Sequence, residues 1–335
     1  MRIAIYGDVH WCQYSSIVRK SGKKYSLRLE NLIKSVNWAE ETAKENQCNI
    51  IVNLGDFFDK SELNSEEITA LNDVVWDDVM RFNIVGNHEM GRSDLSRSSS
   101  HLFKMLPESV VVDEPMVYDF GNVELAFLPY VLEEGRKDIK SYLPRTVIKD
   151  RILFMHNDIQ GIQMGRFKST QGFSKEDIED SCDICFNGHL HNGVKLSSKL
   201  INVGNLTGQN FSEDAFIYTH GMYVYDTDKD KLLFFENPFA LNFYKFDYRS
   251  ELLSPLKKNA VCVIQCNEDD IQDVKNYIAD DIIESRIIVK QEEVEVEHDS
   301  VELFSEDHVK RFHDYILNNM ENTEILLQEL QEVCK

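Results

Sequence analysis

The sequence predicts an α/β fold in which five strands bring polar side chains to one place. Five apolar, strand-like runs are each followed directly by a polar motif, and an amphipathic pattern separates the first two runs. Because ligands bind at the carboxyl ends of the strands in open α/β sheets, the motifs are expected to meet there. In chain order the motifs are Gly7-Asp8-Val9-His10, Gly55-Asp56-Phe57-Phe58-Asp59, Gly86-Asn87-His88-Glu89, His156-Asn157-Asp158 and Gly188-His189-Leu190-His191.

Helices and hairpins are expected between these strands. Residues 26–46 carry apolar side chains at helical spacing and predict an amphipathic helix, and a second helix is expected over residues 65–80. Residues 109–131 predict a β-hairpin with a turn at Gly121-Asn122. Residues 222–235 predict another hairpin, which is expected to close the second sheet of a β-sandwich.

The chain changes character after Pro238, where a small α+β module is expected. An acidic linker and two amphipathic helices are expected to follow it. The expected elements are a strand at 261–266, a helix at 269–279, a strand at 286–289, the linker at 291–300 and helices near 305–320 and 323–334.

The motifs supply carboxylates, imidazoles and one neutral amide, a mixture that suits two divalent cations of the manganese, iron or zinc type. A single Gly-Asp is more often a turn, and a single histidine is more often a structural residue. Five of the ten histidines, however, fall within these motifs. The sequence therefore predicts a binuclear metallophosphoesterase with candidate ligands Asp8, His10, Asp56, Asn87, His156, His189 and His191.

At these motifs the sequence resembles the calcineurin-like metallophosphoesterase superfamily, whose signature is D-x-H, G-D-x-x-D, G-N-H-D/E, H and G-H-x-H. All five parts occur in order within residues 1–205. The resemblance implies a four-layer α-β-β-α sandwich with a small α+β capping domain and C-terminal helices. The implied domains are a catalytic domain at 1–240, a capping domain at 241–297 and partner-binding helices at 298–335.

Within the superfamily the chain looks most like the nuclease subunit of SbcCD-type recombination complexes, including those of bacteriophages. It starts directly on the first metal strand, opens with Gly-Asp-Val-His-Trp, and continues for about 130 residues after the last motif. This resemblance implies a DNA exonuclease and endonuclease for recombination and double-strand-break processing. It also implies two partners besides DNA: a second copy of the chain, and an SbcC-like coiled-coil ABC-type ATPase in a heterotetramer.

The resemblance also assigns roles to the motif residues. One metal is held by Asp8, His10 and His191, and the other by Asn87, His156 and His189. Asp56 bridges them, because a carboxylate can span two cations about 3.5–4 Å apart. The metals expected are Mn²⁺ ions, with Mg²⁺ as the alternative. His88 is expected to act on the substrate, whereas Asp59, where some members carry histidine, is expected to orient His88 or a ligand.

Two other functions are weighed against the nuclease. Protein Ser/Thr phosphatases also carry G-N-H-E, but their second motif continues into Arg-Gly, whereas here Asp59 precedes Lys60 and Ser61. Such a phosphatase or another binuclear phosphoesterase is the first alternative. A catalytically inactive DNA-end scaffold is the second, and it requires a broken metal site. All seven ligand positions are intact.

The formal net charge is −22, which opposes DNA binding as a whole. Residues 251–335 hold 21 acidic side chains against 8 basic ones, while residues 9–29 hold no acid at all. The candidate DNA contacts are Arg19, Lys20, Lys23, Lys24 and Arg28 in that stretch, together with Arg92, which follows the third motif.

The two C-terminal helices are expected to bind the ATPase. Their apolar stripes have helical spacing, and in SbcCD-type complexes such helices grip the base of the coiled coil. The candidate contacts are Val309, Phe312, Ile316, Leu317, Ile325 and Leu330. No run of 18 apolar residues occurs, and the seven cysteines are spread through apolar runs. A soluble protein of the bacterial cytoplasm, or of a phage-infected bacterium, with no membrane contact is therefore expected.

Overall fold

The N-terminal strand β1 (Arg2–Tyr6) uses its two faces differently, and this alternation sets the layers of the fold. Ile3 and Ile5 pack into an apolar core between two sheets, whereas Ala4 and Tyr6 pack beneath helix α1 (Leu27–Glu45). Ser26 caps α1 by accepting a hydrogen bond from the Leu29 amide, 3.2 Å away. The structure, a computed structural model, describes residues 1–145, 149–164, 167–248, 256–278 and 282–290.

The first sheet has six strands and contains the first three motif strands as parallel neighbours. A fourth parallel strand pairs with the third motif strand, and an antiparallel hairpin pairs with the first motif strand. In spatial order its strands are β16 (Lys231–Glu236), β15 (Gly221–Asp226), β1, β2 (Ile50–Asn53), β3 (Met80–Ile84) and β6 (Ser109–Val112).

The second sheet also has six strands and contains the last two motif strands, again parallel and adjacent. In spatial order its strands are β13 (Val194–Lys195), β14 (Leu200–Asn202), β12 (Ile184–Asn187), β9 (Asp150–Met155), β8 (Val123–Leu128) and β7 (Met116–Asp119). Its outer face packs against two short helices, α3 (Ile139–Tyr142) and α4 (Lys175–Ser181).

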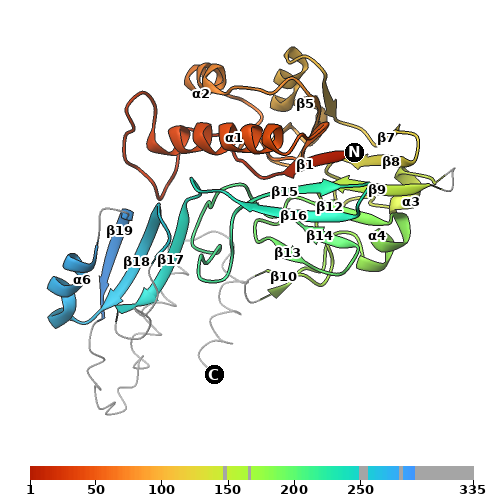
Figure 1. Cartoon of the computed structure of the whole chain (residues 1–335). Helices are drawn as coiled ribbons and strands as arrows, with labels where there is room; N and C mark the ends of the chain where they lie inside the picture. Colours follow the sequence, from red (N-terminus) through yellow and green to blue (C-terminus); the bar gives the residue numbers. More distant parts are fainter. Residues whose placement is uncertain (146–148, 165–166, 249–255, 279–281, 291–335) are drawn as a thin grey trace, which may run out of the picture. The chain divides into compact units, whose positions relative to one another are not determined.

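The two sheets face each other across one apolar core, with helices on both outer faces (Figure 1). This is the predicted α-β-β-α sandwich. Short connecting elements complete its rim. They are α2 (Ser65–Ala70), the 3₁₀ turns η1 (Leu71–Asp73) and η2 (Ser99–Met105), and the two-stranded ribbons β4 (Met90–Gly91) with β5 (Asp94–Ser98) and β10 (Gln163–Met164) with β11 (Phe167–Lys168).

The predicted hairpins form with different partners than expected. The hairpin with the Gly121-Asn122 turn consists of β7 and β8, because β6 leaves to pair with β3 in the other sheet. Residues 222–235 form the β15–β16 hairpin, but it pairs with β1 and so extends the first sheet rather than the second. Alternating patterns predict the strands, whereas the sheet that each strand joins depends on distant partners.

The prediction of a helix over residues 65–80 is correct only for the first half of that range. Helix α2 ends at Ala70, the 3₁₀ turn η1 ends at Asp73, and the backbone is extended at Val74. Asn37 of α1 donates to the Asp73 carbonyl over 3.1 Å and accepts from the Val75 amide over 2.7 Å. These contacts pair backbone groups that a continuing helix would have paired within itself, so the helix stops there.

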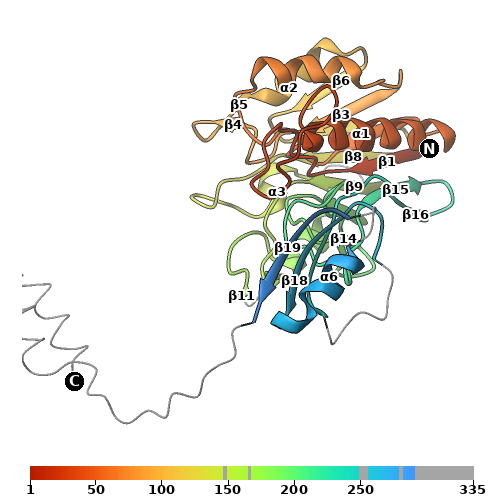
Figure 2. The same ribbon diagram turned by 90° about the vertical axis from the view of Figure 1, so that its left-hand side faces the viewer.

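A three-stranded parallel sheet follows the sandwich (Figure 2). It contains the two strands and the helix predicted for this region, and one further strand, β17, that was not predicted. Its elements are β17 (Asn242–Asp247), β18 (Ala260–Cys266), the 3₁₀ turn η3 (Glu268–Asp270), α6 (Ile271–Tyr277) and β19 (Ile282–Val289). Residues 1–290 form one compact unit, so the predicted division at residue 240 stays a prediction.

The predicted C-terminal helices and their contacts lie outside the described residues. These contacts are Val309, Phe312, Ile316, Leu317, Ile325 and Leu330. Among the helices that the structure does describe, none combines the length and the apolar character needed to cross a membrane.

Candidate metal centre

The five motifs lie at the carboxyl ends of neighbouring strands. β1, β2 and β3 run parallel in the first sheet, and β9 and β12 do so in the second. Their ends meet at one edge of the sandwich, where the side chains of the motifs form overlapping groups. The seven predicted ligands found together there are Asp8, His10, Asp56, Asn87, His156, His189 and His191.

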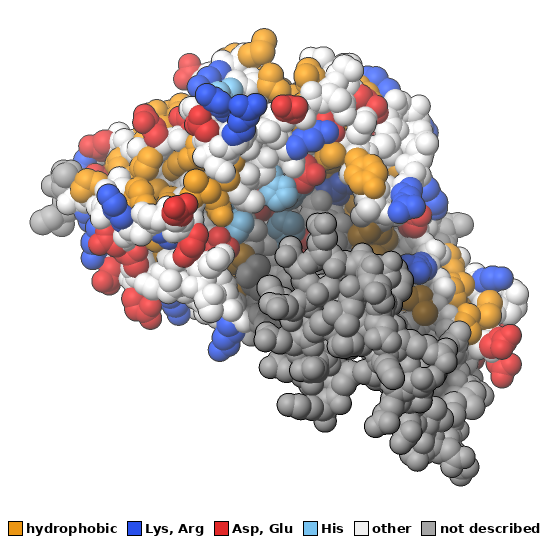
Figure 3. All heavy atoms as spheres, turned by 180° about the vertical axis from the view of Figure 1, so that it is seen from behind, with side chains coloured by type: hydrophobic (Ala, Val, Ile, Leu, Met, Phe, Trp, Pro, Cys, Tyr) orange, Lys and Arg blue, Asp and Glu red, His pale blue; other side chains and the backbone are white. Residues whose placement is uncertain are grey.

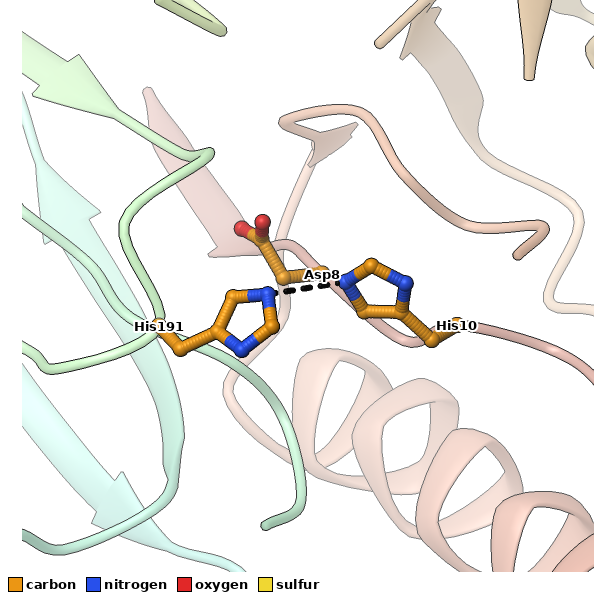
Figure 4. A group of neighbouring side chains, drawn as sticks. All are labelled: Asp8, His10 and His191. Carbon is orange, nitrogen blue, oxygen red and sulfur yellow. Dashed lines mark hydrogen bonds between the residues drawn. The ribbon is translucent and has the colours of Figure 1, made fainter. Parts of the chain in front are cut away.

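Asp8, His10 and His191 form the first group, with one ligand atom of each within 4.8 Å of the others. The Nε2 atoms of His10 and His191 face each other at 3.0 Å beside Asp8 (Figure 4). The Nδ1 atom of His10 lies 2.9 Å from Asp59 Oδ1. The Nδ1 atom of His191 lies 2.8 Å from Glu213 Oε1. These carboxylates accept the Nδ1 hydrogens, so both Nε2 lone pairs remain available for a cation.

Asp56, His156 and His189 form the second group. His156 Nδ1 donates to the Leu54 carbonyl over 2.8 Å, which leaves its Nε2 as an acceptor. That Nε2 lies 3.2 Å from Asp56 Oδ2 and 3.1 Å from Asn87 Oδ1. Asn87 Oδ1 is also 2.9 Å from His189 Nδ1, so the predicted amide ligand joins this group.

In both groups hydrogen-bond acceptors face one another, and such an arrangement requires a proton or a cation between them. Burial of His156 opposes its charged form, but the Asp56 carboxylate outweighs burial and raises the pKa of His156 to about 9. A divalent cation would displace that proton, because imidazole binds metals in its neutral form. The carboxylate, imidazole and amide donors therefore fit two divalent cations.

Asp56 is placed between the two groups. It belongs to the group with His156 and His189 and to a third group with His10 and His88. Burial alone would raise the pKa of Asp56, but the neighbouring His156 holds it well below its usual range. An ionised carboxylate in this position suits the predicted bridging role.

The ligand positions carry an unusual backbone conformation. The φ angles of Asp8, His10, Asp56 and His189 are 52°, 50°, 48° and 74°, which cost non-glycine residues on the order of 1–3 kcal/mol each. His10 N donates to Asp56 O over 2.9 Å, and His189 N donates to the Asp8 carboxylate over 3.0 Å. Gly86 is needed beside them because a Cβ atom there would overlap the Asp56 carboxylate. Strain at four ligand positions agrees with a functional role.

His88 borders the cluster and is more accessible than the deepest ligand. Its side chain is 42% exposed, whereas that of His156 is fully buried. His88 Nδ1 lies 3.2 Å from Asp59 O and 3.4 Å from Asp59 Oδ1, and the hydrogen bond with Asp59 raises the pKa of His88 to about 9. Asp59 thus contacts both His10 and His88. The orienting role expected for it stays a prediction. The action of His88 on the substrate stays a prediction.

Two acidic residues outside the predicted set hold ligand histidines in place. Glu213 is fully buried and contacts His191, as described above. Asp158 Oδ1 lies 3.0 Å from His189 Nε2. Asp158 stands in the His156 motif, so its contact with a ligand histidine could have been proposed from the sequence. Glu213 lies 22 residues beyond His191 and outside every motif, so only the fold identifies it.

Glu89, the last residue of the third motif, has a structural role. Its side chain is fully buried and accepts hydrogen bonds from Gly86 N at 2.8 Å and Phe58 N at 3.0 Å. Burial, together with the charge of Asp56, raises the pKa of Glu89 to about 7. Glu89 therefore joins the loops of the second and third motifs.

The basic loop after the first motif lies on the surface. Arg19, Lys20, Lys23 and Lys24 are exposed, and so is Arg92. Lys24 pairs with Asp73 at 2.7 Å, and the Lys20 ammonium donates to the Ile283 carbonyl. Contact of these residues with DNA stays a prediction.

The predicted DNA contact of Arg28 is wrong. Arg28 lies on the inner face of α1 and is only 3% exposed. Its Nη1 atom donates to the Gly208 carbonyl over 3.1 Å, and burial lowers its pKa to about 10. Helical periodicity turns this residue inward, away from any nucleic acid that follows the loop.

The cluster opens to the surface of the molecule. The side chains of His88, His189 and His191 are 42%, 16% and 27% exposed. Figure 3 shows histidine side chains gathered in a hollow near the centre of the view. A substrate can therefore approach the two ligand groups from outside.

The chain matches one protein family, and several solved structures are similar to it. The calcineurin-like phosphoesterase family matches residues 1–220. No curated protein matches the chain. Among solved structures, a dimetal phosphatase from Danio rerio is 13% identical with a TM-score of 0.42, covering 67% of this chain and 91% of its own. A hypothetical protein from Thermus thermophilus is 10% identical with a TM-score of 0.38, covering 71% of this chain and 100% of its own. The family match spans well over half of the residues, and the chain belongs to the calcineurin-like phosphoesterase family.

Proposed function

We propose that this chain is a metal-dependent DNA nuclease, the nuclease subunit of an SbcCD-type recombination and repair complex. The observation that carries the proposal is an open cluster with all seven ligand side chains together, combined with an exposed loop rich in lysine and arginine that follows the first motif in the sequence. The opening Gly-Asp-Val-His-Trp and the long segment after the last motif support the nuclease branch.

Two divalent cations, most simply Mn²⁺ with Mg²⁺ as the alternative, would supply Lewis-acid activation of water and of the phosphate oxygens. Asp8, His10 and His191 would hold one, and Asn87, His156 and His189 the other, with Asp56 shared. The left-handed backbone and the buried carboxylate contacts keep these side chains in place before the substrate arrives.

His88 would act on the substrate from the edge of the cluster. Its Nδ1 is held by Asp59, so its Nε2 can carry a proton toward the phosphate or the leaving oxygen. General acid catalysis of this kind contributes typically about 10²–10⁴-fold. Asp59 acts through His88 and His10 rather than on the substrate itself.

A protein Ser/Thr phosphatase is the competing activity, and Glu89 in the third motif is the feature that suggests it. The buried position of Glu89 gives it a structural task that does not select a substrate. An inactive scaffold is disfavoured because the ligand groups are complete. The exposed cations Arg19, Lys20 and Lys23 favour a polyanionic substrate over a phosphopeptide.

The deciding experiment compares substrates directly. Purified protein is incubated with linear duplex DNA and Mn²⁺, with a phosphothreonine peptide in parallel and Asp56→Ala as the inactive control. We expect DNA hydrolysis that EDTA abolishes and no release of phosphate from the peptide. Peptide hydrolysis without DNA cleavage would replace the proposal with the phosphatase.

We further propose that the chain works as a homodimer bound to a coiled-coil ABC-type ATPase. The support is the C-terminal sequence, whose apolar stripes follow an acidic linker. Helices of about this length are marginal in water by themselves and gain stability when they bury an apolar face. A groove at the base of a coiled coil would provide such a partner surface.

A further inference from the structure

Tyr130 lies beside the candidate metal centre, although it follows a strand that carries none of the five motifs. That strand, β8, runs parallel to β9 and pairs Leu128 with Met155, the residue before His156. The carboxyl end of β8 therefore reaches the same edge of the sandwich as the motif strands. The ring centroid of Tyr130 lies 5.5 Å from that of His189 and 6.4 Å from that of His156, the two histidines of the second group.

The backbone around Tyr130 is held by the segments that carry ligands of the second group. Tyr130 N donates over 3.1 Å to the carbonyl of Val85, which directly precedes the third motif. On either side of Tyr130, Asn157 of the fourth motif accepts from Val131 N over 2.9 Å and donates to the Pro129 carbonyl over 3.1 Å. Asn157 is fully buried, so water does not compete for these contacts. The position of the phenol ring is therefore set before a substrate binds.

The hydroxyl group of Tyr130 is not used by the protein itself. It forms no hydrogen bond within the part of the chain that the structure describes, and it is not one of the enclosed polar atoms that lack a partner. The residue is only half-buried, so this hydroxyl is open to solvent. By contrast, the Tyr142 hydroxyl accepts from Lys137 N at 3.1 Å, and the Tyr225 hydroxyl donates to Asp230 at 2.7 Å. A phenol ionises at about pH 10, so Tyr130 offers an unused donor at neutral pH.

We propose that Tyr130 is a catalytic residue whose hydroxyl donates a hydrogen bond to a non-bridging oxygen of the phosphate under attack. The inference rests on the proposed phosphodiester hydrolysis and adds a substrate contact to it. His88 and Tyr130 border different ligand groups, since the His88 ring lies 4.7 Å from that of His10 in the first group. A phosphate in front of both groups would therefore meet one donor on each side. Donors that are fixed in advance where negative charge develops make the largest single contribution in many enzymes.

The proposed contact is with the phosphate itself and not with the groups that the phosphate joins. Tyr130 is not part of the wall of the cavity of about 710 Å³ that includes His189 and His191. The hydroxyl should therefore act on every phosphodiester that the cluster accepts, and also on inorganic phosphate. Small probes without a base or a sugar are sufficient to test it.

The first test measures binding of inorganic phosphate to the Mn²⁺-loaded full chain by isothermal titration calorimetry. Tyr130→Phe removes the hydroxyl and keeps the ring against His189. We expect the affinity to fall about 10- to 100-fold, the usual effect of losing one hydrogen bond to a charged group, while the Mn²⁺ content stays the same. Tyr118→Phe is the matched control and should bind phosphate normally, because its half-buried ring packs on Phe82 and Phe127 instead.

The second test identifies the oxygen that accepts the hydrogen bond. It uses methyl p-nitrophenyl phosphate and the two enantiomers of its phosphorothioate, in which sulfur replaces one non-bridging oxygen. Tyr130→Phe should lower kcat/KM for the phosphate about 10- to 100-fold. Sulfur is a weak acceptor, so the loss should nearly disappear for one enantiomer and persist for the other. The p-nitrophenolate group leaves without a proton donor, so the loss does not report on the leaving oxygen. Each ratio compares variant and wild type on the same substrate, so effects of sulfur on the metals cancel.

The outcomes separate this inference from the nuclease proposal. Unchanged phosphate affinity in Tyr130→Phe, loss of Mn²⁺ from that variant, or an equal loss of activity with both enantiomers would overturn the role of the hydroxyl, whether or not the protein cleaves DNA. Wild-type protein that hydrolyses the methyl ester but no DNA would overturn the nuclease proposal and leave Tyr130 in its role. Wild-type protein that neither binds phosphate nor hydrolyses an ester would overturn both.

Discussion

The Nδ1 atom of His191 lies 2.8 Å from Oε1 of the fully buried Glu213. The other carboxylate oxygen of Glu213 accepts from Asn205 Nδ2 at 2.9 Å and from Gln209 N at 2.7 Å. Both oxygens are therefore used, and the carboxylate cannot turn away from the imidazole. This contact fixes the His191 tautomer that presents Nε2 to a cation.

Glu213→Gln should weaken metal binding at the first group. The amide nitrogen of glutamine would meet donors from Asn205 or Gln209, and the His191 tautomer would lose its strongest acceptor. We expect Mn²⁺ affinity to fall about 10- to 100-fold, the usual effect of removing such a partner of a metal ligand. Electron paramagnetic resonance of free Mn²⁺ during titration measures this directly. Glu236→Gln, on an exposed side chain, is the control, and equal affinity in both variants would refute the assignment.

His88→Ala should abolish catalysis while keeping the metals. The imidazole borders the cluster but is 42% exposed, and Asp59 holds it from the side. We expect the rate of DNA hydrolysis to fall by about 10²–10⁴-fold. Metal content, measured by mass spectrometry, should stay at about two ions per chain, as expected for a two-metal site. Asp56→Ala should lose both metal and activity. A His88→Ala protein that binds only one metal would make His88 a ligand.

Replacing Lys20, Lys23 and Lys24 by glutamate should weaken duplex binding and flatten its salt dependence. These side chains are exposed on the loop after the first motif. Removing one phosphate-binding cation should reduce the slope of log K against log salt by about 0.9. Fluorescence anisotropy over a salt series gives the slope. Hydrolysis of methyl p-nitrophenyl phosphate should stay unchanged, and a parallel decrease in that activity would assign the loop to the fold instead.

His220 should make folding stability depend on pH. Burial lowers its pKa to about 4, below the value of about 6.5 for an unfolded chain. The unfolded state therefore binds the proton first, and the stability present above pH 6.5 is lost as the pH falls toward 4. The linkage amounts to about 3 kcal/mol at most.

Urea unfolding of metal-free protein between those pH values measures this loss. His220→Asn keeps a donor for Asn205, which lies 2.6 Å from His220 Nδ1, and should flatten the pH dependence. The metal-ligand histidines are common to both proteins and cancel in the comparison. Identical slopes for wild type and variant would contradict the assignment.

Deleting residues 301–335 should separate activity from assembly. The truncated chain keeps the sandwich and the metal centre, so it should fold, bind metal and cleave DNA without its partner. It should no longer co-purify with the coiled-coil ATPase, because the apolar stripes that include Phe312 and Ile325 are gone. Retention of the ATPase in a pull-down by the truncation would disprove the role of these helices.

The position of the polar motifs at the ends of strands could be predicted because it depends only on neighbouring residues in the sequence. A strand that ends in Gly-Asp or Gly-Asn-His places the next side chain at the sheet edge whatever the rest of the chain does. Helix α1 was likewise predicted within one residue at each end, from its apolar spacing alone.

Other features depended on contacts between distant parts of the chain. Arg28 looked like a member of a basic loop until its guanidinium was found to donate to Gly208, 180 positions away. Helix α2 ends early because Asn37 of another helix pairs its backbone. The β15–β16 hairpin joins the first sheet because β15 pairs with β1, more than 200 positions away in the sequence.

Local sequence patterns were enough to predict which side chains form the candidate metal centre and at which edge of the sheets they lie. Strand alternation and motif spacing act over a few residues, and the chain cannot satisfy them in another way. The packing of distant segments showed that Asp158 and Glu213 hold ligand histidines in place, and which cavity lies beside them. A hydrogen bond between a ligand and a carboxylate on another segment has no local pattern, because its geometry exists only once the sheets have packed.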